Sequence, residues 1–240
     1  MAEETYERVL LKLSGEALGG DGEILDFDKL NDAARMIAKL WHTGVQVAIV
    51  IGAGNIWRGR KGPAESMNKV TADHMGMLAT VINALAMQDA LERVDPDIQA
   101  RVMTAVEMNR CAEPYYWRQA IHHLERGRIV LFGYGTGDPL HSTDTASAQR
   151  AVEIEADAML FAKNVDGIYD KNPDKHADAV LLPDLTYEQA LALPESGIDR
   201  TALVISKENK LKAIRVFSLN DPENIMRVVA GEGIGTVVHL

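Results

Sequence analysis

Lys12 is the residue whose position most directly suggests chemistry. It lies in the stretch LLKLSG, at the end of an otherwise apolar run. Because an unpaired buried charge is costly, a lysine in this place must either extend its ammonium group to solvent or meet an anion. A second cation, Arg58, follows the apolar run VQVAIVI within the glycine-rich stretch IGAGNIWRG. Both cations are therefore candidates for binding an anionic ligand.

Three glycine-bearing loops follow apolar runs in the sequence. They read KLSGEALGG, IGAGNIWRG and GYGTGDPLHSTD. Glycine lets backbone N–H groups approach a ligand closely, and successive N–H groups at a helix N-terminus bind anions. In open α/β sheets ligands lie beyond the carboxyl ends of the strands, so the three loops should meet at one edge. That arrangement indicates a phosphate site and directs Arg58 toward the edge that carries Lys12.

Asp144, in the stretch STDTA, allows two interpretations. An aspartate before a helix is a favoured N-cap, whose carboxylate accepts backbone N–H bonds. It could equally belong to the phosphate site, because GYGTGDPLHSTD leads directly into that helix. The local pattern does not choose between the two.

Several common kinds of site are absent from the sequence. There is no G-x-x-x-x-G-K-[ST] motif, and Trp57 stands where the third glycine of a dinucleotide-binding pattern should be. Neither H-E-x-x-H nor a Cys/His ligand spacing occurs, and we expect the adjacent His122 and His123 to face solvent. The single cysteine, Cys111, cannot form an internal disulfide and is expected to be a buried thiol.

The charge and hydropathy of the chain limit its partners. Its 240 residues carry a formal net charge of -10 and are 47% hydrophobic, which is typical of a globular protein rather than one that coats nucleic acid. No apolar run approaches the ~20 residues that a membrane-spanning helix needs. The N-terminal stretch MAEETYERV is charged, unlike a signal peptide. We expect a cytoplasmic protein that binds neither nucleic acid nor membranes.

Apolar runs and helical periodicities alternate along the chain, and they define the elements that must position these residues. The runs predict strands at 8–13, 45–51, 99–106, 128–133, 157–162, 213–219 and 235–240. The periodicities predict helices at 28–43, 73–93, 113–127, within 134–155, and at 186–193, 199–210 and 222–231. Such alternation is typical of an α/β fold with a mainly parallel central sheet and helices on both faces. The irregular segment 164–189 divides this single domain, 1–240, into two lobes, roughly 1–160 and 161–240.

Six stretches are distinctive in their order and spacing. They are LLKLSGEAL, IGAGNIWRG, ADHMGMLATVINALAMQDAL, GTGDPLHSTDTA, EIEADAML and NVDGIYDKNP. With them the chain resembles the bacterial-type uridylate (UMP) kinases of the amino-acid-kinase superfamily, from about Arg8 to the C-terminus. The resemblance implies a three-layer sandwich and transfer of the γ-phosphoryl group of ATP, which carries Mg²⁺, to UMP in pyrimidine nucleotide synthesis.

The resemblance also implies roles for residues of this sequence. Lys12, Arg58 and Asp144 would be catalytic, the last by orienting Lys12. ATP would contact Lys12, Leu13, Ser14, Gly15, Gly54, Arg58, Lys163, Asn164, Tyr169 and Asn172. UMP would contact Ala53, Asp73, Thr136, Gly137, Asp138, Pro139, Leu140, His141, Ser142 and Thr143. The N-terminal lobe would hold UMP and the C-terminal lobe ATP, with no dedicated metal ligand because Mg²⁺ arrives with ATP.

At four positions the sequence departs from the family pattern. Ala53 replaces a usual glycine, Asp138 an asparagine, His141 an aromatic residue and Asn172 an aspartate. Asp138 adds a negative charge beside the uracil and accepts hydrogen bonds where asparagine could also donate them. The loop GGDGEILD is shorter than the loop through which family members respond to GTP. The resemblance implies a homohexamer, with GTP or UTP as effectors.

Two other functions share this fold. Kinases that act on a carboxylate, a carbamate or another phosphate belong to the same superfamily, although DHMGMLAT and GTGDPLHSTDTA favour a nucleotide acceptor. Molybdate- or tungstate-storage proteins resemble UMP kinases in fold but would have lost phosphate-site residues. Lys12, Arg58 and Asp73 are all present here, which favours the kinase.

Overall fold

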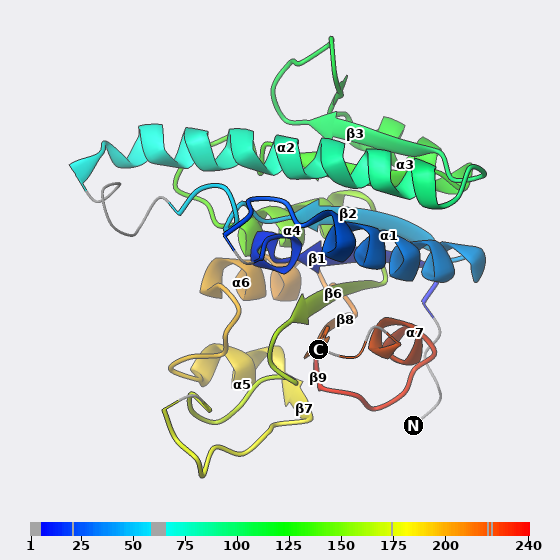
Figure 1. Cartoon of the computed structure of the whole chain (residues 1–240). Coiled ribbons are helices and arrows are strands. Elements are labelled where there is room, and N and C mark those ends of the chain that lie inside the picture. Colours follow the sequence, from blue (N-terminus) through cyan, green and yellow to red (C-terminus); the bar gives the residue numbers. More distant parts are fainter. Residues whose placement is uncertain (1–5, 21, 59–65, 174, 220, 222) are drawn as a thin grey trace.

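The computed structural model describes residues 6–20, 22–58, 66–173, 175–219, 221 and 223–240 (Figure 1). Three features of the sequence fall partly outside the described residues. They are the charged N-terminal stretch at residues 1–5, the loop GGDGEILD at Asp21, and the stretch IGAGNIWRG at Gly59.

A single nine-stranded sheet forms the centre of the described structure, in the order β4-β3-β5-β2-β1-β6-β8-β9-β7. Neighbouring strands are parallel except for β8 and β9, which are antiparallel. The strands are β1 (Arg8–Leu13), β2 (Gln46–Ile51), β3 (Ala100–Thr104), β4 (Glu113–Pro114), β5 (Ile129–Gly133), β6 (Ala158–Lys163), β7 (Asp184–Thr186), β8 (Ala213–Ser218) and β9 (Thr236–His239). The predicted α/β fold with a mainly parallel sheet is confirmed.

The sequence patterns predict all of these strands except β4 and β7. β4 has two residues and β7 has three, which is too few for an apolar pattern to be visible. The two short strands are the edges of the sheet. Pro114 lies in β4 opposite Thr104, where an edge strand tolerates its missing N–H. The predicted helix 113–127 is therefore wrong at its start, since Pro114 belongs to β4 and the helix begins at Trp117.

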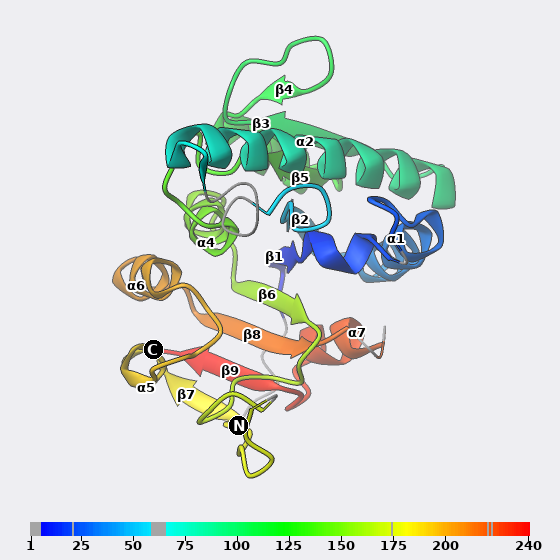
Figure 2. The same ribbon diagram turned by 60° about the vertical axis from the view of Figure 1, so that its left-hand side comes forward.

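Helices cover both faces of the sheet, as predicted. They are α1 (Phe27–His42), α2 (Lys69–Val94), α3 (Trp117–Glu125), α4 (Thr143–Glu153), α5 (Tyr187–Ala192), α6 (Arg200–Glu208) and α7 (Asn224–Val229), with a short 3-10 helix, η1 (Gly15–Leu18). Figure 2 shows α4, α5 and α6 on one side of the sheet and α1 and α7 on the other. None of the helices in the described ranges combines the length and the apolar character that crossing a membrane requires.

The start of α2 differs from the prediction, which placed it at Asp73. The helix begins four residues earlier, at Lys69, because the Asn68 side chain caps it by accepting the N–H groups of Val70 and Thr71. Asp73 therefore lies in the second turn of a continuous helix, and this rigid element fixes its position.

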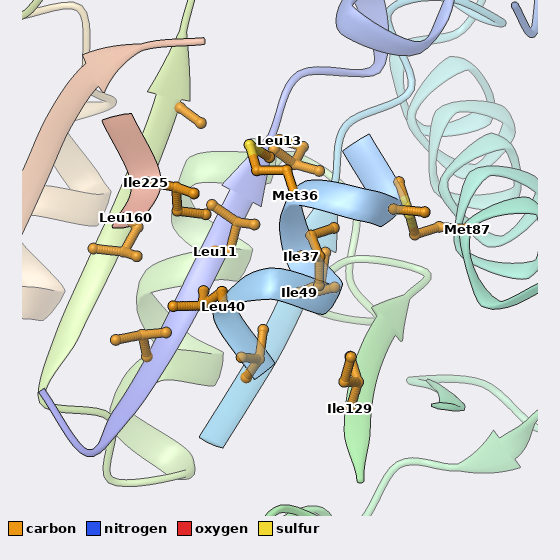
Figure 3. Packing of buried hydrophobic residues seen from close by; sticks show 14 of the residues in the cluster. Leu11, Leu13, Met36, Ile37, Leu40, Ile49, Met87, Ile129, Leu160 and Ile225 are labelled. Carbon is orange, nitrogen blue, oxygen red and sulfur yellow. The ribbon is translucent and has the colours of Figure 1, made fainter. Parts of the chain in front are cut away.

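Side-chain alternation along β1 distributes its residues between the two cores. Leu11 and Leu13 pack with Ile37 of α1 in one buried cluster (Figure 3). Leu10 belongs to the cluster on the opposite face, which includes residues of α4 and α6. Because alternate residues of a strand point to the same face, Lys12 lies on the face of Leu10, toward α4.

Candidate active site

A hollow of about 400 Å³ lies at the carboxyl edge of the sheet. Its wall combines Val50 of β2 and Phe132 of β5 with residues of α2. Eight of the predicted site residues line it: Ala53, Gly54, Arg58, Asp73, Thr136, His141, Ser142 and Thr143. The structure thus brings the loops after β2 and β5 and the start of α2 to one place.

Lys12 forms a largely buried ion pair beside this hollow. It lies between Val50 of β2 and Phe161 of β6 in the sheet. Its Nζ is 3.0 Å from Oδ1 of Asp144, and the two side chains are only 13% and 16% exposed. The same Nζ lies 5.5 Å from the centre of the Phe161 ring, a cation–π distance. Lys12 does not line the hollow itself, but its partner Asp144 directly follows Thr143, which does.

Asp144 lies in the first turn of α4 but is not the N-cap of that helix. Ser142 is the cap, and its hydroxyl accepts the N–H of Thr145 at 3.1 Å. The N-cap interpretation of Asp144 is therefore wrong. Its carboxylate pairs with Lys12 and accepts the N–H of Asp199 at 3.2 Å, so it joins β1, α4 and the start of α6.

Lys163 completes a group of two cations and one carboxylate. It lies two residues after Phe161, and its Nζ is also 5.5 Å from the centre of that ring. Burial lowers the pKa of Lys163; the Asp144 carboxylate opposes this shift and the Lys12 ammonium adds to it. The Lys163 ammonium donates a hydrogen bond to the carbonyl of Gly197. Two positive charges thus converge on Asp144 at the carboxyl ends of β1 and β6.

A second hollow, of about 160 Å³, lies beyond Lys163. Tyr169 and Asn172 line it together with Gly197, whose carbonyl binds Lys163. Asn164 is exposed and is not among its described lining residues. Of the four predicted ATP residues between 161 and 240, Tyr169 and Asn172 therefore line this smaller hollow, and Lys163 contacts its wall through Gly197.

Arg58 is exposed at the rim of the larger hollow, where the neighbouring loop holds it. Its Nη2 is 2.8 Å from Oε1 of Glu16, and its Nε donates to the carbonyl of Gly54 at 3.1 Å. Glu16 also lines the hollow. Sequence reasoning missed Glu16, although it lies two residues after Ser14 in the first glycine loop.

The first two glycine loops touch so closely that only glycine fits between them. A Cβ on Gly15 would lie 2.3 Å from the carbonyl oxygen of Gly52 and 2.5 Å from Oδ1 of Asn55. The fully buried Asn83 of α2 fixes this contact, because its amide donates to the Gly52 carbonyl at 2.7 Å and to Oδ1 of Asn55 at 2.9 Å. Asn83 and Asn55 are further residues that the sequence analysis missed. An asparagine within an apolar helical pattern is the signal that could have revealed Asn83.

The turn that carries Arg58 is anchored on α2. Trp57 Nε1 donates to the carbonyl of Ala72 at 2.9 Å, and Trp57 lines the hollow. Ala53 is not one of the four described non-glycine residues with positive φ. Alanine in place of the family's usual glycine therefore imposes no left-handed backbone strain at this position.

The loop after β5 is bound to α2 through Asp73, whose Oδ2 accepts the N–H of Leu140 at 2.8 Å. Two non-glycine residues of this loop have left-handed backbone, Tyr134 with φ of 64° and Leu140 with φ of 70°. Thr136 and the segment 141–143 line the hollow, whereas the segment 137–140 is not among its described lining residues. Only part of the predicted UMP segment therefore faces the hollow.

Two predictions outside the hollow are wrong. His123 is buried rather than solvent-facing, with Nε2 2.9 Å from Glu113 Oε2 and Nδ1 2.9 Å from Arg128 Nη1. Its neighbour His122 is exposed, as expected. Cys111 is exposed rather than buried. Within the described ranges, no group of three or more His, Cys, Asp or Glu side chains has an arrangement that could hold a metal ion.

Comparison with known proteins agrees with this geometry. Residues 7–217 match the amino acid kinase family. The chain is 48% identical over 240 residues to the uridylate kinase of Xanthomonas oryzae pv. oryzae, covering 100% of this chain and 99% of that protein. Its fold is similar to the crystal structure of UMP kinase from Bacillus anthracis, with a TM-score of 0.94, 36% identity and coverage of 98% and 97% of the two chains. It is also similar to UMP kinase from Ureaplasma parvum, with a TM-score of 0.89, 33% identity and coverage of 98% and 99%. The resemblance to uridylate kinases is thereby confirmed, and the chain belongs to the amino acid kinase family.

Proposed function

We propose that the protein is a UMP kinase, which transfers the γ-phosphoryl group of ATP to UMP and releases ADP and UDP. The observation that carries the proposal is the Lys12–Asp144 pair at the carboxyl edge of the sheet, next to a hollow with Arg58 at its rim. The chain's full-length similarity to uridylate kinases supports the choice of UMP as acceptor.

The reaction needs positioning and cationic stabilisation rather than a general base. The acceptor is a phosphate oxygen that is mostly ionised at neutral pH, since its second pKa is about 6. The obstacle is repulsion between two polyanions that must lie in line. Lys12 and Arg58 would stabilise the charge on the transferring phosphoryl group, and Asp144 would hold the Lys12 ammonium in place. Magnesium would enter with ATP and neutralise part of the phosphate charge.

The two nucleotides would occupy the two hollows. UMP would lie in the larger one, against Asp73, Thr136 and the segment 141–143. The phosphates of ATP would lie along the loop after β1, and its adenosine would reach the smaller hollow of the C-terminal lobe. The lobes, roughly 1–160 and 161–240, would thus divide acceptor from donor. Glu16 holds Arg58 now, so the phosphates would have to compete with that carboxylate for the guanidinium.

A panel of acceptors tests the proposal. Initial rates with ATP and Mg²⁺ would be measured for UMP, CMP, dTMP and GMP, and for aspartate, glutamate and acetylglutamate. UMP should be the preferred acceptor, and omission of Mg²⁺ should abolish turnover. Phosphorylation of an amino acid but not of UMP would identify another kinase of the superfamily. Molybdenum or tungsten in the purified protein, without kinase activity, would favour oxoanion storage.

Removal of the Asp73 carboxylate should weaken the binding of UMP without weakening that of ATP. In Asp73→Ala the proposed contact with the UMP ribose and the bond from the Leu140 N–H are both lost. Because bonds to charged groups are strong, we expect KM of UMP to rise about tenfold or more. KM of ATP should stay near the wild-type value. Asp89→Ala is the matched control, because among the described residues the ion pair of Asp89 is with Arg93, on the exposed face of the same helix. An unchanged KM of UMP in Asp73→Ala would remove Asp73 from the acceptor site.

The proposed homohexamer finds support on the outer face of α2. Met75, Leu78 and Ile82 are 36%, 46% and 50% exposed and lie at helical spacing on one face. A glutamate in such an interface would be buried without a partner. We expect Ile82→Glu to reduce the assembly's mass in light scattering, whereas Val204→Glu, on the exposed face of α6, should leave it unchanged. An identical mass for Ile82→Glu and wild type would place the interface elsewhere.

Effectors and location complete the proposal. We expect a cytoplasmic enzyme whose rate responds to GTP or UTP, as in the family it resembles. Initial rates at fixed ATP and UMP, with and without each effector, would test this, and the short GGDGEILD loop predicts a weak response to GTP.

A further inference from the structure

Arg150 is a buried cation of α4 that does not line the larger hollow but contacts the loop that does. Only 3% of the residue is exposed. Its Nη2 donates to the carbonyls of Gly135 and Thr136, at 3.1 Å and 3.4 Å. Gly135 and Thr136 both belong to the lining of the larger hollow. The guanidinium therefore binds the back of the loop whose front faces the proposed acceptor.

The other contacts of Arg150 hold its guanidinium in a single orientation. Nη1 lies 2.6 Å from Oε2 of Glu153, and the guanidinium carbon lies 3.9 Å from the centre of the Tyr115 ring. The Tyr115 hydroxyl donates to the same carboxylate, and Gln149 donates to the other oxygen at 2.8 Å. Burial and the Glu153 carboxylate raise the pKa of Tyr115, so its hydroxyl stays a donor. A planar guanidinium that stacks on an aromatic ring, pairs with a carboxylate and donates hydrogen bonds to two carbonyls is a rigid support.

The loop needs such a support because its backbone is strained. Tyr134 has φ of 64° and Gly135 has φ of 57°. A non-glycine residue in this region costs on the order of 1–3 kcal/mol and persists only where its surroundings fix it. On the α2 side, the N–H of Tyr134 donates to the Thr80 hydroxyl at 2.9 Å, and the Tyr134 hydroxyl lies 3.0 Å from Nδ1 of His74. Arg150 holds the loop from the α4 side, so α2 and α4 fix it between them.

A second route connects the same cluster to the hollow. The Tyr115 ring packs edge-on against Phe132, with ring centres 5.4 Å apart and an interplanar angle of 90°. Phe132 lines the hollow. The cluster of Arg150, Glu153 and Tyr115 thus contacts the wall at Phe132 and at the loop 135–136.

We infer that Arg150 is a positioning residue for the acceptor nucleotide, which fixes the loop 135–136 in the shape that UMP requires. The inference rests on the proposed function, because it takes the larger hollow as the UMP site. It assigns no contact between Arg150 and a nucleotide. The expected signature is a selective loss of acceptor affinity, without loss of donor affinity.

The test compares Arg150→Lys and Arg150→Met with the matched control Arg215→Lys. Arg215 is also a buried arginine that donates to two carbonyls, those of Glu232 and Ile234, but it lines neither hollow. Titration calorimetry would give the Kd of UMP, steady-state kinetics the KM of UMP and of ATP, and thermal melting the Tm. Lysine retains the charge opposite Glu153, but its single nitrogen cannot reproduce the planar, two-sided geometry with which arginine reaches both carbonyls and the carboxylate.

In both Arg150 variants we expect Kd and KM of UMP to rise about tenfold or more, with KM of ATP within about twofold of wild type. Arg215→Lys should lower Tm without changing the affinity for UMP. Tyr115→Phe, which removes one bond to Glu153 and keeps the stacked ring, should raise KM of UMP by a smaller factor; it provides the test should the Arg150 variants not fold.

An Arg150→Lys protein that melts at lower temperature but binds UMP as wild type does would overturn the inference, because Arg150 would then be structural only. An equal rise in KM of UMP and of ATP would overturn it as well. Wild-type protein that neither binds nor phosphorylates UMP would instead refute the proposed function, and the inference with it.

Discussion

Lys12→Ala is expected to lower kcat by at least ~10²-fold, the scale for losing one donor that stabilises a developing oxyanion. The Lys12 ammonium is held at 3.0 Å from Asp144 at the carboxyl end of β1, so in the proposed reaction it would meet the transferring group without reorganisation. Loss of a group that acts mainly in the transition state lowers kcat more than it raises KM. Steady-state rates with UMP and ATP would measure this split.

The structure supplies a matched control for the lysine substitution. Lys207 of α6 forms a surface ion pair with Glu188 of α5. Lys207→Ala should leave both kcat and KM unchanged, because exposed ion pairs contribute little. A Lys12→Ala enzyme that kept most of its activity would remove Lys12 from the mechanism.

Asp144→Asn should lower both turnover and stability. Without the carboxylate, the charge that offsets the repulsion between the Lys12 and Lys163 ammonium groups, each 5.5 Å from the centre of the Phe161 ring, is lost. Removing one partner of a largely buried ion pair costs about 3 kcal/mol of unfolding free energy. We also expect kcat to fall by about 10²-fold, because Asp144 would no longer hold Lys12 toward the phosphates of the proposed ATP site.

The stability loss in Asp144→Asn should depend on pH. Burial and Lys12 already lower the pKa of Lys163, and removal of the opposing carboxylate should lower it further. Above that lowered pKa the unfolded chain binds more protons than the folded protein, so the free energy of unfolding rises with pH up to the ordinary lysine pKa of about 10.4. Denaturant unfolding at neutral and at alkaline pH would measure the shift. A loss that stays constant across this range would mean that Lys12 and Lys163 do not repel each other.

The fold could be predicted from the sequence because buried parallel strands read as apolar runs and helices as periodic ones. The strands β4 and β7 were not predicted, because segments of two or three residues are too short to show a hydrophobic period. The start of α2 was predicted too late, because Asn68 caps the helix before its apolar stripe begins. Cys111 and His123 were placed wrongly because the local sequence does not show which surface of the fold a side chain meets.

The site could be predicted in part, for a related reason. The rule that ligands lie at the carboxyl ends of strands correctly joins the loops that carry Gly15, Gly54 and Thr136. The rule does not say how β1 and α4 are placed relative to each other, so it could not reveal that Lys12 pairs with Asp144. The burial of Arg150 could not be predicted, because a polar residue in an amphipathic helix is usually expected to be exposed.

Whether ATP and UMP meet at adjoining sites is tested by the binding of a bisubstrate ligand, adenosine and uridine joined through their 5′ positions by a polyphosphate chain. We predict that calorimetry finds one molecule bound per chain, more tightly than either ATP or UMP, excluding both, and weakened in Lys12→Ala and in Arg58→Ala. A bisubstrate ligand that binds no more tightly than UMP alone, or that leaves ATP free to bind beside it, would contradict the proposal that the phosphates of the two nucleotides meet between the two hollows.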